Sequence, residues 1–173
     1  MRSLLTFPNP VNEKAARVVA GLVVVTAVIA LVLRAEWLVW VLGAGFLLRV
    51  LSGPRFDPFG QVATRLVAPR LGPATLVAGP PKRFAQGLGL AFSVTSGVSL
   101  ALGATTLGWL VLGLLVVAAT LESVFGFCLG CVAFGLLQRA GVVPESVCEA
   151  CNDIWSRRTD GAVGPGVPVD ARV

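Results

Sequence analysis

The sequence predicts an all-α integral membrane protein, and its composition, its apolar segments and the placement of its basic residues all lead to this fold class. Of the 173 residues, 55% are hydrophobic and only 13% are charged, and the mean hydropathy is +0.84. Soluble domains usually carry about 25% charged residues. This chain therefore has too few polar side chains for a surface that faces water on every side, and the lipid bilayer must surround part of it.

Four apolar segments are candidates for transmembrane helices, namely residues 18–33, 37–51, 88–103 and 107–125. A helix needs about 20 residues to cross the hydrocarbon layer, so the first two segments must include flanking residues. Three residues separate the first two segments, and the short stretch Gly103-Ala-Thr-Thr106 separates the last two. Connections this short predict two antiparallel helical hairpins.

The basic residues are distributed unevenly between the two sides of the predicted membrane domain. One side carries Arg34, which Glu36 balances. The other side carries Arg2, Lys14, Arg17, Arg55, Arg65, Arg70, Lys82, Arg83, Arg139, Arg157 and Arg158. Because Lys and Arg are enriched in cytoplasmic loops, we expect a multi-pass protein of the cell membrane with both termini cytoplasmic. The net charge of +5 then reflects membrane topology, and we expect no nucleic-acid partner.

The two predicted hairpins also resemble each other in sequence. Trp37-Leu-Val-Trp-Val41 corresponds to Trp109-Leu-Val-Leu-Gly113, and Arg49-Val-Leu-Ser-Gly53 corresponds to Glu122-Ser-Val-Phe-Gly126. A glycine break and an amphipathic segment follow each hairpin, over residues 57–70 and 127–139. We therefore expect an internal repeat in which a short interfacial helix follows each hairpin. Chance similarity between apolar, glycine-rich stretches is the alternative.

The expected domain organisation follows from these segments. We expect a single integral membrane domain over residues 1–160, which includes a cytoplasmic cysteine-containing segment over residues 126–158. Residues 159–173 are expected to form a disordered tail, because the sequence after Gly164 is rich in Gly and Pro and has no hydrophobic periodicity.

The four cysteines form two CxxC pairs, Cys128-Leu-Gly-Cys131 and Cys148-Glu-Ala-Cys151, and they are the leading candidates for chemistry. The chain contains no His, which excludes His-based catalytic triads and His metal ligands. Since cytoplasmic thiols are kept reduced, two static structural disulfides are not expected on that side of the membrane.

One interpretation of the cysteine pairs is thiol–disulfide exchange. If glycines break the chain after residue 125, Cys128 lies at the start of the following helix, where the partial positive charge of the helix end lowers a thiol pKa. Cys128 would then be the attacking thiolate and Cys131 the resolving thiol. Cys148 and Cys151 would pass electrons to or from a soluble partner.

Other interpretations of the cysteines stay open. All four could hold one structural zinc ion, because a separation of about 15–20 residues between two CxxC pairs is typical of tetrathiolate zinc sites. The pairs could also transfer a soft metal ion across the membrane, since thiolates favour soft metals. They could, finally, be small buried side chains without a chemical role.

Arg49 and Glu122 are charged residues near the predicted cytoplasmic ends of two apolar segments. A charge within the hydrocarbon layer is costly, so it is usually paired or functional. We therefore expect an ion pair between Arg49 and Glu122 that connects the two hairpins. The alternatives are that the Arg49 side chain extends to the interface and that Glu122 donates a proton near Cys128.

Three stretches carry a resemblance to a known family. They are Asn9-Pro-Val-Asn-Glu-Lys-Ala-Ala-Arg17, Gly53-Pro-Arg-Phe56 and Thr120-Leu-Glu-Ser-Val-Phe-Gly-Phe-Cys-Leu-Gly-Cys131, and the likeness covers roughly residues 8–155. Together they resemble a bacterial family catalogued as domain of unknown function 4395. The resemblance implies a multi-pass membrane protein without an assigned activity. It favours thiol chemistry with a thioredoxin-like or sulfurtransferase partner.

Overall fold

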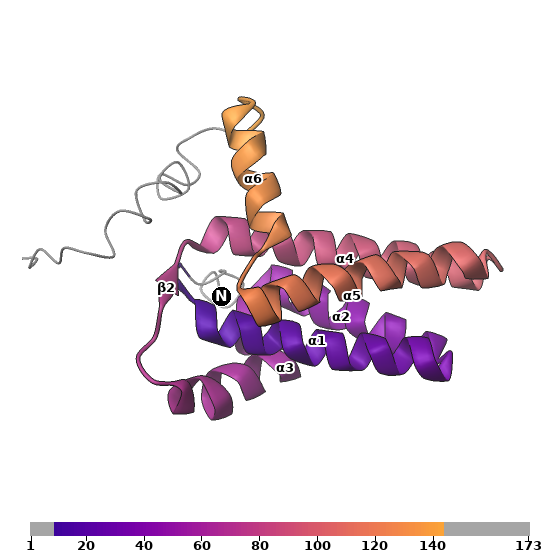
Figure 1. Cartoon of the computed structure of the whole chain (residues 1–173), viewed down its shortest axis with the longest axis horizontal. Helices are drawn as coiled ribbons and strands as arrows, with labels where there is room; N and C mark the ends of the chain where they lie inside the picture. Colours follow the sequence, from indigo (N-terminus) through magenta and orange to yellow (C-terminus); the bar gives the residue numbers. More distant parts are fainter. Residues whose placement is uncertain (1–8, 144–173) are drawn as a thin grey trace, which may run out of the picture.

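The computed structural model describes residues 9–143, and most of these residues are helical (Figure 1). Four helices in this part are long and apolar enough to cross a membrane. They are α1 (Glu13–Leu33), α2 (Glu36–Ser52), α4 (Gly79–Ala101) and α5 (Thr105–Phe125). The prediction of a helical chain with four such segments is confirmed. Cys148, Cys151 and the predicted tail over residues 159–173 lie outside the described residues.

All four helices begin before the predicted apolar segments, and α1 and α4 do so by several residues. Helix α1 starts at Glu13 because Asn12 caps it, with the Asn12 side chain accepting a hydrogen bond from the backbone nitrogen of Lys14 at 3.1 Å. Helix α4 starts at Gly79, and Pro80 and Pro81 occupy its first turn, where a proline costs no hydrogen bond. Lys82, which the sequence placed in a loop, therefore lies within helix α4.

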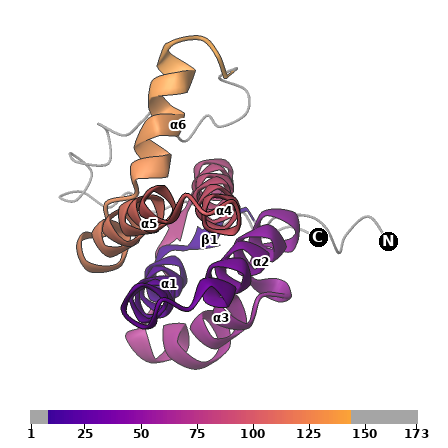
Figure 2. The same ribbon diagram turned by 90° about the vertical axis from the view of Figure 1, so that its right-hand side faces the viewer.

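The four helices form a bundle in which α1 contacts α2 and α5, and α4 also contacts α2 and α5 (Figure 2). The apolar core of the bundle contains Val23, Ala27, Ala30, Val39, Leu42, Phe46, Leu100, Leu112, Leu115 and Ala119. Small residues allow the helices to approach closely. Gly89 of α4 packs under the ring of Phe46, and Gly97 packs under Trp40.

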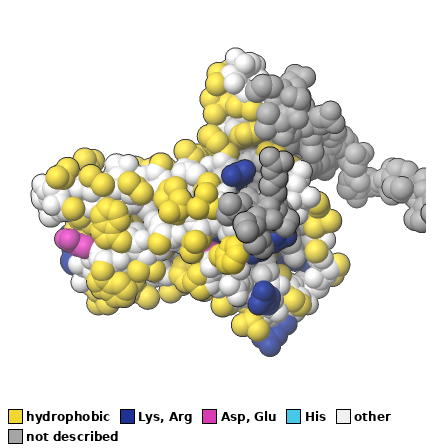
Figure 3. All heavy atoms as spheres, turned by 180° about the vertical axis from the view of Figure 1, so that it is seen from behind, with side chains coloured by type: hydrophobic (Ala, Val, Ile, Leu, Met, Phe, Trp, Pro, Cys, Tyr) yellow, Lys and Arg dark blue, Asp and Glu magenta, His cyan; other side chains and the backbone are white. Residues whose placement is uncertain are grey.

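The outer surface of the bundle is apolar, as a lipid-facing surface requires. Hydrophobic side chains cover the flank seen in Figure 3, and the charged side chains on that face lie near its two ends. Trp37, Leu110 and Val117 are examples of exposed apolar residues. At the end where α1 turns into α2, the guanidinium of Arg34 lies 5.3 Å from the ring centre of Trp109. We call this end the turn end, and the opposite end, which carries residues 53–78 and α6, the cysteine end.

The connection from α2 to α4 is helical over much of its length. It contains a 3-10 turn (Gly53–Arg55), α3 (Pro58–Gln61), a π-helical stretch (Val62–Val67) and a second 3-10 turn (Ala68–Leu71). Ala63 and Ala68 pack against α1 at Ala15 and Val19. Two short strands, β1 (Val11–Asn12) and β2 (Leu76–Val77), pair antiparallel, with Val11 opposite Val77. The sequence analysis did not predict these strands.

Helix α6 (Leu129–Arg139) follows α5 after a break and projects away from the bundle (Figure 1). The break begins at Gly126, which ends α5 with a φ of 69°, a left-handed conformation that favours glycine. Helix α6 packs on α4, where the rings of Phe84 and Phe134 are 5.6 Å apart. Gly130 lies directly against the backbone of Ala85. The start of α6 is therefore held against the cysteine end of the bundle.

Candidate functional site

The candidate site is built around Cys128 and Cys131, which the break after α5 places at the start of α6. Cys128 is the N-cap residue of α6, and its Sγ accepts a hydrogen bond from the backbone nitrogen of Cys131 at 3.3 Å. The Cys131 thiol donates to the same Sγ atom at 2.8 Å. Both cysteines are free thiols, and Cys128 is 8% exposed. Small side-chain rotations would therefore bring the two sulfurs to bonding distance.

This geometry separates the acidities of the two thiols. The hydrogen bond from the Cys131 thiol lowers the pKa of Cys128 below its ordinary value, and the positive charge of Lys82 acts in the same direction. Burial and the negative charge of Glu122 oppose this effect on the pKa of Cys128 without reversing it. The same hydrogen bond raises the pKa of Cys131. Cys128 is consequently the more acidic thiol of the pair, and Cys131 the less acidic one.

A buried ion pair lies next to the cysteines. Lys82 of α4 donates from Nζ to Oε1 of Glu122 on α5 at 2.7 Å, and the two side chains are 8% and 14% exposed. Both charges act on the two cysteine sulfurs. The pair connects α4 to α5 near the end of α5, just before the break that leads to Cys128.

A second ion pair involves Arg49, and it corrects the sequence-based prediction. Arg49 Nη1 lies 2.9 Å from Oδ2 of Asp57, and both side chains are buried. The predicted ion pair between Arg49 and Glu122 is therefore wrong, because each residue has a closer partner of opposite charge. The connection after α2 folds back and brings Asp57 to Arg49, whereas the early start of α4 brings Lys82 to Glu122. Both charges are therefore paired at this end of the bundle, but each has a partner other than the one expected.

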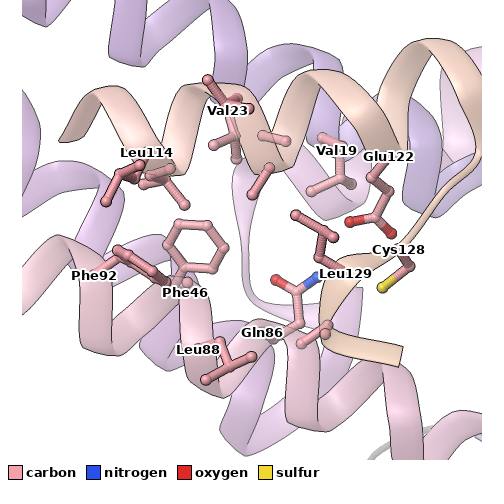
Figure 4. A pocket seen from close by; sticks show the side chains of 18 of the residues that line it. Val19, Val23, Phe46, Gln86, Leu88, Phe92, Leu114, Glu122, Cys128 and Leu129 are labelled. Carbon is pink, nitrogen blue, oxygen red and sulfur yellow. The ribbon is translucent and has the colours of Figure 1, made fainter. Parts of the chain in front are cut away.

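A cavity of about 360 Å³ extends from Cys128 into the helix bundle (Figure 4). Its lining is mostly apolar and comes from all four long helices and the start of α6. Cys128 and Glu122 lie at one end, and Phe92 and Leu114 lie at the other (Figure 4). Although six residues separate Glu122 from Cys128 in sequence, the break at Gly126 turns both toward the same cavity. The cavity therefore gives an apolar ligand access to the buried sulfur.

Gln86 connects this cavity to a second, smaller one. Its Oε1 accepts a hydrogen bond from Arg49 Nε at 2.9 Å, which turns its amide nitrogen to the opposite side. In Figure 4 this nitrogen points toward Leu129 and Cys128. The second cavity, of about 160 Å³, is lined by Gln86 together with Arg49, Lys82 and residues of the N-terminal segment. Lys82 thus lies on one cavity and its partner Glu122 on the other.

The sequence analysis identified part of this site and missed three of its residues. It selected Cys128, Cys131, Glu122 and Arg49, which all lie at the cysteine end of the bundle. It missed Lys82, Asp57 and Gln86 as functional groups. The rarity of Lys in the chain was the available signal for Lys82, since the sequence contains it only at positions 14 and 82. The position of Asp57 immediately before Pro58, which is typical of a helix N-cap, was the signal for Asp57.

Within residues 9–143, no group of three or more Cys, Asp or Glu side chains is placed to hold a metal ion. A zinc site formed with Cys148 and Cys151 would require residues that lie outside this range. The zinc interpretation of the four cysteines therefore stays a prediction.

Comparison with known proteins places the chain in a family. A family model described as Domain of unknown function (DUF4395) matches residues 11–139. No curated protein and no solved structure matches the chain. Because the match covers more than half of the chain, the protein belongs to the DUF4395 family, as the resemblance of its sequence stretches predicted.

Proposed function

We propose that this member of the DUF4395 family is a membrane protein of thiol–disulfide exchange, with Cys128 and Cys131 as its redox pair. The observation that carries the proposal is the position of Cys128 Sγ, which caps α6 and accepts hydrogen bonds from both the backbone nitrogen and the thiol of Cys131. A thiolate is the reactive form of cysteine, and these hydrogen bonds favour it.

The exchange proceeds in two steps with conserved atoms and electrons. The Cys128 thiolate attacks one sulfur of a partner disulfide, and the other partner sulfur leaves as a thiolate. Cys131 then loses its proton and attacks Cys128 in the mixed disulfide, which forms the Cys128–Cys131 disulfide and releases the second partner sulfur. The partner is reduced by two electrons and the protein is oxidised by two. The reverse reaction uses the same mixed disulfide.

The proposed partner is a soluble protein on the cytoplasmic side, either thioredoxin-like or a sulfurtransferase. The cysteine end of the bundle carries Lys14, Arg17, Arg55, Arg65, Arg70, Lys82, Arg83 and Arg139, whereas the turn end carries Arg34 with Glu36. This asymmetry supports an orientation in the cell membrane with the cysteine end and both termini in the cytoplasm. Cys148 and Cys151 would then form a second pair on the same side of the membrane.

The helical segments after α2 and α5 support the proposed internal repeat. In this proposal, the segment over residues 58–71 and helix α6 both lie at the membrane interface. Helix α6 exposes Leu129, Val132 and Leu136, which provide apolar contacts for lipid. It also ends with Arg139, which suits the headgroup region. The segment over residues 58–71 and helix α6 would each place a capped helix N-terminus beside the ends of the transmembrane helices.

Trapping of the mixed disulfide tests the proposal. Reduced full-length Cys131→Ser protein is mixed with hydroxyethyl disulfide, a small neutral probe, and the modified residue is identified by peptide mass. We expect a stable adduct on Cys128 in Cys131→Ser and a Cys128–Cys131 disulfide in the unaltered chain. In the control variant Cys128→Ser, Cys131 should react more slowly because its sulfur is partly buried, which raises its pKa, and because it lacks the backbone hydrogen bond that Cys128 accepts.

The metal content of the same preparation is the measurement that can contradict thiol exchange. Protein purified without added metal or chelator should retain its reactive thiols in the Cys128–Cys131 pair. About one zinc ion per chain, lost when any one of the four cysteines is replaced by serine, would contradict thiol exchange. It would instead show a tetrathiolate clamp that includes Cys148 and Cys151.

A further inference from the structure

We infer that the apolar cavity next to Cys128 binds a lipid-soluble quinone, which oxidises the Cys128–Cys131 dithiol. The inference rests on the proposed exchange function and gives it a direction, from a soluble dithiol through the cysteine pair to the membrane. A redox pair needs a second partner to be turned over, and the structure places a cavity against the thiolate of this pair. The nature of the cavity defines that partner.

The position of the cavity indicates a ligand from the bilayer. Its lining includes residues of α1, α2, α4 and α5, the four helices long and apolar enough to cross a membrane. Leu114 and Val117 line it and are 58% and 57% exposed, so its opening lies on the outer, lipid-facing surface of α5. A volume of about 360 Å³ suits one substituted ring and falls in the usual range of ligand pockets, about 300–1,000 Å³. A long apolar tail would extend into the lipid.

The distribution of polar groups specifies the head of the ligand. The apolar part of the cavity carries the rings of Phe46 and Phe92, which favour packing against another flat ring. The end near the sulfur carries Gln86 and Glu122. The Gln86 amide nitrogen points toward this end, because its oxygen is bonded to Arg49, and it can donate to a carbonyl oxygen. A neutral ring with carbonyl acceptors fits these groups, whereas an anionic lipid headgroup would be repelled by the Glu122 carboxylate.

The reaction between this ligand and the cysteine pair is balanced. The Cys128 thiolate adds to the quinone ring, and Cys131 then loses its proton and attacks Cys128 Sγ. The sulfur–sulfur bond forms as the sulfur–quinone bond breaks. Two electrons pass from the sulfurs to the ring, which leaves as the hydroquinone after its two oxygens gain two protons. One proton comes from Cys131, and one must come from the solvent.

The Lys82–Glu122 pair provides a path for the second proton. Glu122 lines the cavity that holds the proposed quinone, and Lys82 lines the smaller cavity near the N-terminal segment. The 2.7 Å hydrogen bond between them joins a residue of one cavity to a residue of the other. Gln86 lines both cavities as well. Glu122 is therefore a positioning residue that gives the quinone oxygens access to protons from the cysteine end.

Oxidation of the reduced full-length protein by decylubiquinone, without oxygen, tests the inference. This fully substituted quinone has no free ring position for permanent arylation of a thiol. We expect formation of the Cys128–Cys131 disulfide, mapped by peptide mass, together with an equal amount of hydroquinone. Ala118→Phe, which fills the cavity from α5, should slow this oxidation about tenfold or more. The matched control Ala44→Phe, at an exposed position on α2, should leave it unchanged.

Each alternative outcome has a distinct meaning. Exchange of Ala118→Phe with hydroxyethyl disulfide is measured in parallel. A loss of oxidation by decylubiquinone that exceeds the loss of exchange assigns the effect to the cavity and not to the cysteine pair. Equal oxidation of Ala118→Phe and Ala44→Phe by decylubiquinone would overturn the quinone site. If the protein shows no exchange at all, binding of decylubiquinone to Cys128→Ser is measured by equilibrium dialysis. Binding that the added substitution Ala118→Phe removes supports the cavity as the quinone site, and absence of binding refutes it. A tightly held phospholipid that decylubiquinone cannot displace would also refute it.

Discussion

Two of the four long apolar helices, α2 and α5, end in similar ways and continue into segments of different chemistry. After α2, Gly53 has a φ of 67°, and Asp57 then caps the next helical turn by accepting from the backbone nitrogen of Gly60 at 2.7 Å. After α5, Gly126 has a φ of 69°, and Cys128 caps α6 by accepting from the backbone nitrogen of Cys131 at 3.3 Å. In each case a glycine break delivers a capping side chain to the cysteine end of the bundle.

The difference between the two caps lies in what holds them. The carboxylate of Asp57 is fixed by the buried guanidinium of Arg49, which also bonds Gln86 and stacks 4.4 Å from the ring centre of Phe46. The Cys128 sulfur has no charged partner at hydrogen-bond distance: it accepts a hydrogen bond from the Cys131 thiol, and Cys128 lines an apolar cavity. The same local backbone arrangement therefore serves structure at Asp57, and in our proposal it serves chemistry at Cys128. The predictions below test this division of roles.

Removal of the sulfur at Cys128 should have the largest effect on activity. Cys128→Ser removes the reactive thiol but keeps a side chain that caps helices well, so we expect no Cys128–Cys131 disulfide and only slow reaction of Cys131 with hydroxyethyl disulfide. The free energy of unfolding in detergent should change by less than about 1 kcal/mol. Residual exchange at the rate of the unaltered protein would assign the chemistry to another cysteine.

Removal of the carboxylate at Asp57 should have the largest effect on stability. Asp57→Ala leaves Arg49 buried without its partner and removes a helix cap, so we expect a loss of about 3–5 kcal/mol in the free energy of unfolding. Replacement of both groups, Arg49→Met with Asp57→Asn, should recover much of this loss because no unpaired charge remains. Asp57→Ala with unchanged stability would show that this cap is not a structural lock.

The charges next to Cys128 should shift its pH dependence in opposite directions. The thiolate forms as the pH rises through the pKa of Cys128, which already lies below its ordinary value. Glu122 raises this pKa and Lys82 lowers it, so Glu122→Gln should move the alkylation profile to lower pH and Lys82→Met to higher pH. The rate of iodoacetamide reaction at Cys128, followed by peptide mass across pH, measures both shifts. Unchanged profiles would show that the Lys82–Glu122 ion pair does not influence the acidity of the Cys128 thiol.

The contact of α6 with α4 should have the smallest effect of the four. A Cβ atom on Gly130 would lie 2.6 Å from the Cα of Ala85, so Gly130→Ala should displace the start of α6 and cost about 1–3 kcal/mol. Gly113→Ala is the matched control, because a Cβ atom at that helical position meets nothing within 4 Å. Thermal unfolding in detergent compares the two variants. Equal stability would mean that α6 is not held at this point.

The sequence predicted the membrane helices well because long apolar segments are a strong signal. It placed the starts of α1 and α4 too late, since Glu13, Lys14 and Lys82 are polar residues within helices whose capping and proline signals begin earlier. The wrong Arg49–Glu122 pair follows from this error. With Lys82 assigned to a loop and Asp57 to a surface helix, Arg49 and Glu122 had no other partners in view.

Part of the candidate site depends on tertiary structure and was not predictable from sequence patterns. Cys128 and Cys131 were predictable from their spacing and from the preceding glycine. The cavity depends on five helices and on the break that turns Glu122 and Cys128 the same way. The strands β1 and β2 are each two residues long, too short for an alternating pattern.

Redox titration of the unaltered protein tests the central claim most directly. Full-length protein is equilibrated with glutathione buffers of defined reduced-to-oxidised ratio, quenched with an alkylating reagent and analysed by peptide mass. We predict a reversible two-electron transition in which Cys128 and Cys131 become linked to each other. If both thiols stay reduced across the whole range, or pair irreversibly with other cysteines only after unfolding, the Cys128–Cys131 pair is not a redox centre.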